Sequence, residues 1–200
     1  MKGQQEVIAV ILISGILIGV VGSVYLWGVP LIQKNKDIAT LENSEKFVRS
    51  LNNKIKFIAN NGGRDQTRID LPGIFRFTSN SNSIELVVDT QGTIYATDAE
   101  IPLGKNAVCA AVTGVFGLDD PDTICVKSTK ISEDSYKTTY TIKYLKLINV
   151  DVGRNFLINL IGDTATGGEA STIIFENKGT AQTNDNDKVL ITSVIYVTII

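Results

Sequence analysis

The stretch from Val7 to Ile32 reads VIAVILISGILIGVVGSVYLWGVPLI and contains no charged residue. As an α-helix that rises about 1.5 Å per residue, it is roughly 39 Å long. This length exceeds the hydrocarbon thickness of a bilayer, which is about 30 Å. The sequence therefore predicts an apolar helix near the start of the chain that is long enough to cross a membrane.

The residues in front of this run, Lys2, Gly3, Gln4 and Glu6, indicate how the N-terminus is processed. A secretory signal is cleaved behind its apolar region, after small residues. Here the candidate cleavage site, between Gly3 and Gln4, lies in front of the apolar region. Cleavage at this site would leave the apolar helix at the N-terminus of the mature protein, which is how a filament subunit is built.

Lys2-Gly3-Gln4, an acidic residue soon after, and an unbroken apolar helix together resemble the leader and mature start of archaeal type IV pilin-like proteins, a superfamily that includes the archaellins. The resemblance covers roughly residues 1–35. It implies that a membrane prepilin peptidase cuts after Gly3 and that the freed helices pack as the core of a helical filament. It also implies membrane assembly machinery with an ATPase motor. Glu6 would be the third mature residue, whereas many members carry a glutamate as the fifth.

A small-residue surface runs along the apolar helix. Gly15 and Gly19 form a GxxxG pair, and further small residues extend it. Such faces let helix backbones approach closely in lipid, although one GxxxG also arises by chance because glycine is common in membrane helices. We expect the following subunit-core contacts: Glu6, Ser14, Gly15, Gly19, Gly22 and Ser23. Glu6 suits the positive end of the helix dipole and can pair with the Gln4 amine of a neighbour; the alternative is a solvated acid at the membrane surface.

The far end of the apolar run carries residues with defined physical roles. Tyr25 and Trp27 are amphipathic rings of the kind that settle at the boundary between lipid and water. Gly28 and Pro30 follow, and Pro30 removes a backbone donor and clashes with the preceding turn. We therefore expect a kink or a local break there.

A second helical pattern follows over residues 33–61. Ile38, Leu41, Val48, Leu51, Ile55 and Ile58 recur at spacings of three, four and seven. This pattern predicts one apolar stripe, which we expect to dock on the rest of the chain. The Asn60-Asn61-Gly62-Gly63 sequence is typical of a helix end. If the two helical segments are continuous, they form a rod of roughly 85 Å.

From Arg64 onward the pattern changes to short β-branched and aromatic runs separated by turn residues. The expected strands are 74–78, 84–88, 93–97, 136–148, 156–161, 172–175 and 189–200. Their density without alternating helices favours an antiparallel β-sandwich. The last run is too short to cross a membrane and is expected to be a central strand; donation to a neighbouring subunit is the alternative. The predicted fold is α+β and lollipop-shaped: leader 1–3, apolar helix 4–32, amphipathic extension 33–61 and extracellular head 62–200.

Cys109 and Cys125 are the two cysteines of the chain. In an exported domain, a pair separated by 16 positions favours a disulfide, which contributes about 3 kcal/mol for a loop of that size. Two free buried thiols are the alternative. An oxidised pair would also place the head outside the cytoplasm.

The composition argues against several functions. The net charge of −2 offers no basic surface for nucleic acid, and the chain has no histidine, the usual general base and the commonest metal ligand. Asp119, Asp120 and Asp122 form the densest acidic patch, but their spacing matches no calcium loop and an ordinary turn is favoured. No nucleophile has a visible activator. We therefore expect no enzyme activity, no cofactor and no metal.

These observations favour a structural subunit of an archaeal type IV pilus-like surface filament, with adhesion as its default role. The expected partners are other copies of the chain, the peptidase and assembly machinery, and the membrane before assembly. One alternative is an archaellin-type motility subunit. Another is a single-pass membrane protein whose sandwich binds a carbohydrate or a protein, and a third is a secreted enzyme or lectin freed by ordinary signal cleavage after Trp27.

Overall fold

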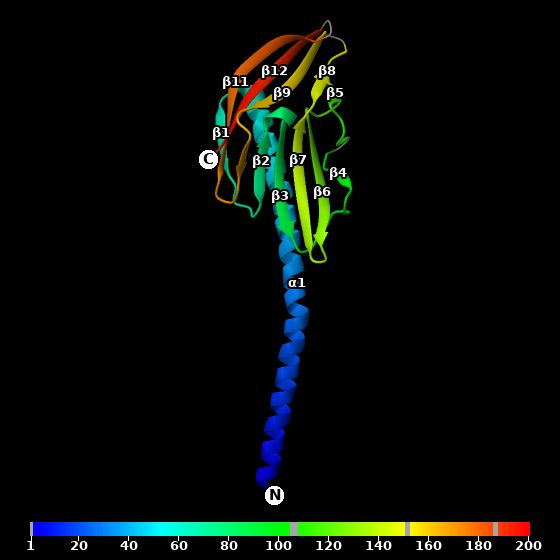
Figure 1. Cartoon of the computed structure of the whole chain (residues 1–200), viewed down its shortest axis with the longest axis vertical. Coiled ribbons are helices and arrows are strands. Elements are labelled where there is room, and N and C mark those ends of the chain that lie inside the picture. The colour runs from blue at the N-terminus through cyan, green and yellow to red at the C-terminus, as the bar shows by residue number, and fades with distance from the viewer. Residues whose placement is uncertain (1, 105–107, 151–152, 186–187) are drawn as a thin grey trace.

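The computed structural model has the shape of a lollipop, with one long helix and a β-sheet head (Figure 1). It describes residues 2–104, 108–150, 153–185 and 188–200, with side chains from Ile8 onward. Helix α1 (Lys2–Asn61) runs without interruption for 60 residues, roughly 90 Å at about 1.5 Å per residue. The architecture is α+β, as expected from the sequence.

The break expected at Gly28 and Pro30 is absent, because α1 continues through Pro30 and Figure 1 shows no sharp bend in it. A proline inside a helix removes one backbone hydrogen bond and crowds the turn before it. The helix is favoured on both sides of Pro30. The apolar run precedes it, and the stripe that packs in the head follows it. The local cost is therefore absorbed without ending the helix.

The second half of α1 is built into the head. The apolar stripe is buried there: Leu41, Val48, Leu51, Ile55 and Ile58 are each at most 2% exposed. The stripe contacts strands of both sheets. The helix ends at Asn61, where Gly62 has φ of +78° and its N–H donates to the Ile58 carbonyl at 2.9 Å. The predicted docking stripe and glycine stop are both confirmed.

The described part of the head forms twelve strands. They are β1 (Arg64–Arg68), β2 (Ile74–Thr78), β3 (Ser83–Thr90), β4 (Glu100–Pro102), β5 (Thr113–Val115), β6 (Asp122–Ser132), β7 (Ser135–Tyr144), β8 (Lys146–Ile148), β9 (Arg154–Ile161), β10 (Ala165–Gly167), β11 (Thr172–Asp185) and β12 (Lys188–Ile199). A single 3-10 turn, η1 (Ser79–Ser81), links β2 to β3.

The strands form two six-stranded sheets. The first has the order β1-β11-β12-β9-β8-β5 and the second β10-β2-β3-β7-β6-β4. Most neighbours are antiparallel, but β12 pairs with β9, and β5 with β8, in parallel. The first parallel pair arises because the chain leaves β9, adds β10 to the second sheet and returns through β11. As expected, β12 is an interior strand of its own head.

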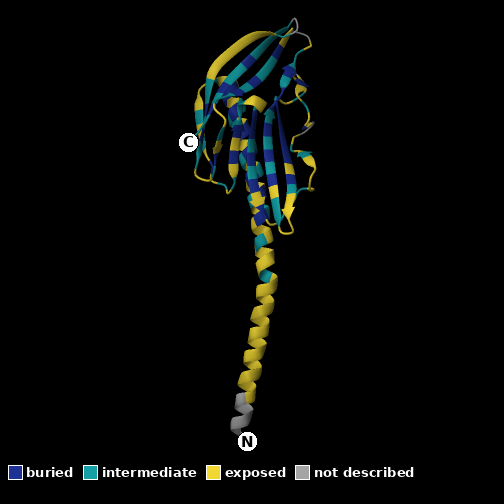
Figure 2. Ribbon diagram, in the orientation of Figure 1, coloured by how far each residue is buried: buried dark blue, intermediate teal, exposed yellow. Residues whose placement is uncertain are grey.

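The core fills the space between the two sheets and α1. Phe75, Phe77, Tyr140 and Phe175 are its largest fully buried side chains. Strand β7 shows the regular alternation of a half-buried strand from Thr138 onward. In Figure 2 the buried residues occupy the head, whereas the described free part of α1 is mostly exposed.

The strand predictions were wrong in several places. The expected strand 136–148 is divided between β7 in the second sheet and β8 in the first, and the expected strands do not include β1, β4, β5 and β10. Residues 93–97 form no strand; only Thr97 makes an isolated bridge, to Ser128. Conversely, the expected strands do not include β6, because the sequence favours a turn at Asp122. It is nevertheless one of the longer strands. Its polar residues Asp122, Thr123 and Ser128 are buried. A strand with so many buried polar residues lacks the apolar pattern by which a strand is predicted from sequence.

Candidate assembly surface

The first half of α1 presents an apolar surface that no described part of the chain covers. Its large apolar side chains from Ile8 to Ile32 are between 47% and 84% exposed (Figure 2). Exposed apolar patches of this extent mark contact with a membrane or a partner. Among the described residues, α1 is long and apolar enough to span a membrane, with a mean hydropathy of 2.5 in its most apolar window. A signal sequence meets the same criterion.

Three glycines make one side of this surface nearly flat. A Cβ added at Gly15, Gly19 or Gly22 would meet no described atom within 4 Å apart from the adjacent residues and the nearby backbone of the helix itself. At about 100° per residue these three positions share one face, with Ser23 at its edge. Ser14 is about a quarter turn from Gly15 and lies outside this face. Of the five small residues expected on one surface, the three glycines and Ser23 therefore share a face, and the contacts expected there stay a prediction.

The two serines of the apolar segment do not present free donors to their surroundings. The Ser14 hydroxyl donates to the Val10 carbonyl, and the Ser23 hydroxyl to the Gly19 carbonyl, both at 2.8 Å. Such bonds to the preceding turn satisfy the hydroxyl within the helix. The two serines therefore leave no unsatisfied hydroxyl donor, which suits this surface to an apolar environment.

Tyr25 and Trp27 lie on the free part of the helix, on the side nearer the head. Their exposed fractions are 69% and 84%, the latter the highest among the large apolar side chains that the structure describes. Neither ring packs on the head. Both rings are therefore exposed, and their place at a boundary between lipid and water stays a prediction.

The junction between the free helix and the head is held by a buried carboxylate. Asp37 is 6% exposed. It accepts hydrogen bonds from the Gln33 side chain at 3.0 Å and from the Gln91 backbone N–H at 3.1 Å. Because Gln91 belongs to the segment after β3, these bonds join the helix to the lower end of the head.

Nearer the middle of the head, Tyr95 and Tyr140 attach the same helix through hydrogen bonds. The Tyr140 hydroxyl donates to the Leu41 carbonyl at 2.9 Å, and the Tyr95 hydroxyl to Glu45 at 3.0 Å. Burial, helped by Glu45, raises the pKa of Tyr95 to about 12. Burial also raises the pKa of Tyr140 well above its usual value. Both hydroxyls therefore remain hydrogen-bond donors at a pH at which an exposed tyrosine would already lose its proton.

A second polar cluster joins α1 to β6. The Asn52 amide donates to Asp122 at 2.7 Å and accepts from the Tyr144 hydroxyl at 3.0 Å, and Lys56 makes an ion pair with Asp122 at 2.9 Å. Burial, with the Asp122 charge as a smaller cause, raises the pKa of Tyr144 well above 10. Sequence reading missed this cluster, because its members are far apart in the chain. It attaches the second half of α1 to β6 and β7.

The acidic patch has structural uses. Asp122 is committed to the cluster with Asn52 and Lys56, and Asp119 accepts the Val115 backbone N–H at 2.7 Å. Within the described part of the chain, the group of close metal-ligand side chains that stands out is instead Glu100, Cys109 and Cys125. Cys109 and Cys125 form a disulfide bond with each other, so their sulfurs are not available as thiolate ligands.

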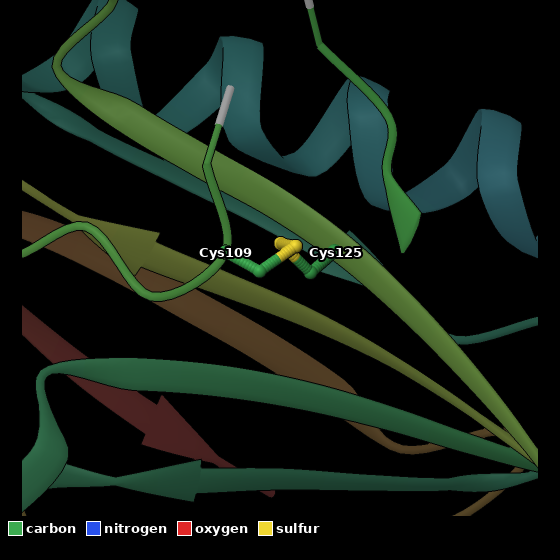
Figure 3. Close-up of a disulfide and its surroundings, with 2 residues drawn as sticks. All are labelled: Cys109 and Cys125. Atoms are coloured by element: carbon green, nitrogen blue, oxygen red, sulfur yellow. A yellow bond between two sulfur atoms is a disulfide. The ribbon is translucent and has the colours of Figure 1, made fainter. Parts of the chain in front are cut away.

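Figure 3 shows the disulfide between Cys109 and Cys125, whose Cα atoms are 5.8 Å apart. Cys125 lies on β6, and Cys109 belongs to the connection between β4 and β5. The bond therefore holds this long connection against the second sheet. It is the pairing that was expected from the sequence.

The processing residues Lys2, Gly3 and Gln4, together with Glu6, lie outside the described side chains, although the backbone is helical from Lys2. Neither their contacts nor the pairing expected for Glu6 is described by the structure.

Fold and surface together define a protein with a bare apolar N-terminal helix that is rigidly continued into a two-sheet β head. The chain belongs to the family described as "Family of unknown function (DUF7289)", whose model matches residues 2–194. The match covers the helix and the head together, so both belong to the unit that defines the family. No curated protein and no solved structure matches the chain.

Proposed function

We propose that the protein is a structural subunit of an archaeal type IV pilus-like surface filament, assembled through the apolar part of α1. The observation that carries this proposal is the bare apolar surface from Ile8 to Ile32 on a helix that continues into the core of the head. A simple anchor needs no such rigid connection. A polymer does, because each head must be placed accurately relative to a packed core.

Assembly would exchange lipid neighbours for other copies of the same helix. Lipid and a helical core are similarly apolar, so the hydrophobic effect contributes little to this exchange. Association must then come from close packing, for which the open face at Gly15, Gly19 and Gly22 is suited. Before assembly the same helix would hold the subunit in the cytoplasmic membrane, with Tyr25 and Trp27 at its boundary.

In this proposal the prepilin peptidase reads Lys2 and Gly3 and releases Gln4 as the mature N-terminus. The new amine can neutralise Glu6 of a neighbouring copy, since a charge in an apolar core needs a partner. The head would cover the outside of the filament. Adhesion is the proposed role, and an archaellin-type motility role differs from it only in the machinery that turns the filament.

Electron microscopy of native cells with and without the gene tests the proposal. We expect thin filaments that disappear on deletion and return on complementation. The mass of the protein from native cells should lack residues 1–3 and retain the apolar helix. An intact Met1 in the membrane fraction, with no filaments, would instead support a single-pass surface protein, and a mature start after Trp27 would support a secreted one.

A further inference from the structure

The end of the head from which the free part of α1 leaves carries two exposed isoleucines. Ile131 lies on β6, close to the turn that joins β6 to β7, and is 58% exposed. Ile94 lies in the segment after β3 and is 46% exposed. The β6–β7 turn lies beside the helix at this end of the head, as Figure 1 shows. We call these two isoleucines and the β6–β7 turn the base of the head.

A groove between the base and α1 fixes the height of the base along the helix. The groove has a volume of about 390 Å³. The helix contributes Pro30, Lys34 and Ile38 to its lining, and the base contributes Ile94 and Asp134 of the β6–β7 turn. The base therefore lies beside the last residues of the apolar run.

The apolar run from Val7 to Ile32 determines where a bilayer would lie along α1. The run is roughly 39 Å long. The hydrocarbon core of a bilayer is about 30 Å thick, and the headgroup layers extend the total to about 40–45 Å. A bilayer that covers the whole run therefore leaves roughly three residues of it among the headgroups at each end. At the end nearer the head, these residues are Pro30, Leu31 and Ile32.

Covering the whole run is favourable because its last apolar side chains are bare. Val29, Leu31 and Ile32 are 47%, 55% and 57% exposed, and each would otherwise keep its apolar surface in water. Lys34, two positions after Ile32, is the first charged residue beyond the run. The helix then leaves the membrane close to Lys34, which is the height of the base.

We infer that the base of the head lies in the headgroup layer of the membrane, with Ile94 and Ile131 inserted among the lipids. The partner of this surface is the bilayer that holds the apolar run, because the base continues the membrane-facing surface of the helix without a gap in height. Exposed apolar side chains at that depth gain from burial. The contact would keep the head upright on the membrane. This inference rests on the membrane-held state in the proposed function, which the single-pass alternative shares.

The charged side chains of the base and of the helix beside it have both signs. Glu133 and Asp134 in the turn are exposed, as are Lys34 and Lys36 on the helix, and Lys130 on β6 is partly exposed. These charges nearly cancel, so they neither draw the base strongly toward a charged surface nor repel it. Insertion therefore depends on the two isoleucines, and a membrane of phosphatidylcholine is the suitable probe.

Quenching of a fluorophore by labelled lipid tests the contact in the full chain, reconstituted into phosphatidylcholine vesicles. The native cysteines are bonded to each other, so a single introduced cysteine takes the label. The test variants are Ile94→Cys and Ile131→Cys, both at exposed positions where substitution is tolerated. Lipid with a nitroxide on its headgroup should quench both labels about threefold more strongly than the label of a control on the far end of the head.

Leu118→Cys is this matched control, because Leu118 is also apolar and is 79% exposed. Its neighbour Asp119 lines a cavity together with Asn60, and Asn60 is roughly 39 Å along the helix from Lys34. The Leu118 label should therefore stay outside the lipid. A label at Val24→Cys, on the apolar run, should be quenched by lipid with a nitroxide deep in its acyl chain, which shows that the helix is in the bilayer.

A quenched Val24 label with Ile94 and Ile131 labels at the level of Leu118 would overturn this inference and leave the proposed function intact. The same result is expected if a second copy, rather than lipid, covers the base. An unquenched Val24 label would overturn this inference together with the membrane-held state on which it rests. Cells without filaments, whose protein nevertheless shows the expected quenching, would overturn the filament proposal alone.

Discussion

Asn82 connects the two sheets through the backbone of β9. Its side-chain N–H donates to the Ile158 carbonyl at 2.9 Å, and its side-chain oxygen accepts the Leu160 N–H at 2.7 Å. Asn82 itself has φ of +48°, a conformation that asparagine tolerates better than most residues. Strand β8 pairs with only the first part of β9. Farther along β9, the side-chain amide of Asn82 makes hydrogen bonds to the backbone like those of a neighbouring strand.

Replacing Asn82 with alanine should therefore destabilise the head by about 2 kcal/mol. The change removes two hydrogen bonds and leaves a carbonyl and an N–H of β9 without partners. Chemical unfolding of the full chain in detergent measures the effect. Asn80→Ala is the matched control, because Asn80 is exposed in the same turn and should change the unfolding free energy by less than about 0.5 kcal/mol. Equal effects of the two changes would contradict the bridging role.

Alkaline pH should destabilise the head through its buried tyrosines. The folded-state pKa of Tyr95 is raised to about 12, and the pKa values of Tyr140 and Tyr144 are also raised well above the usual value of 10, in each case mainly by burial. Above pH 10 the unfolded chain loses these protons while the folded chain keeps them. The unfolding free energy is therefore unaffected by these groups below pH 10 and falls as the pH rises beyond it.

The check is the unfolding free energy of the full chain measured from pH 8 to pH 12, with tyrosinate absorbance followed in parallel. Tyr144→Phe should lower stability at neutral pH, because Asn52 loses a hydrogen bond, but it should reduce the alkaline slope. If the slope of this variant matches that of the wild type, Tyr144 is not one of the groups responsible.

Local patterns predicted the elements whose signal is local. The stripe from Leu41 to Ile58 repeats at helical spacing, and Asn61-Gly62 ends the helix where the pattern stops. The disulfide followed from there being only two cysteines. In each case, the physical cause lies within a short stretch of chain or in a simple count.

The misses depend on contacts between distant residues. Strand β6 begins at Asp122, a residue type typical of turns. In the structure Lys56 of the helix pairs with its charge, and Asn52 donates a hydrogen bond to it. The stretch around Tyr95 looks like a strand, but its side chain is used to reach Glu45, and the backbone turns at Asp98 with φ of +61°. The parallel pairing of β9 with β12 depends on the path of the whole chain. No local periodicity encodes these relationships.

Reducing the disulfide between Cys109 and Cys125 should lower the unfolding free energy by about 3 kcal/mol, as expected for a closed loop of this length. The free part of α1 should stay helical, whereas its second half belongs to the core of the head that reduction destabilises. Thermal unfolding with and without a reductant measures it. The Cys109→Ala, Cys125→Ala double variant should behave like the reduced protein and be insensitive to the reductant. A wild-type protein whose stability does not change on reduction would contradict the prediction.

Replacing Gly15 and Gly19 with isoleucine should abolish assembly while leaving the single chain intact. Apart from the adjacent residues and the nearby backbone of the helix itself, no described atom lies within 4 Å of a Cβ at either position, so the folded subunit can accept the larger side chains. Isoleucine is also apolar, so insertion into the membrane should be retained. The loss would then arise only between copies, where the bulk prevents close approach of the helices.

The measurement compares filament yield with the amount of protein in the membrane fraction. Val24→Leu is the matched control, because Val24 lies about half a turn away from Gly15 at 100° per residue and is 65% exposed. It should assemble within about twofold of the wild type, since an apolar swap outside the close contact changes little. If the glycine variant assembles as well as this control, the packed face is elsewhere on the helix.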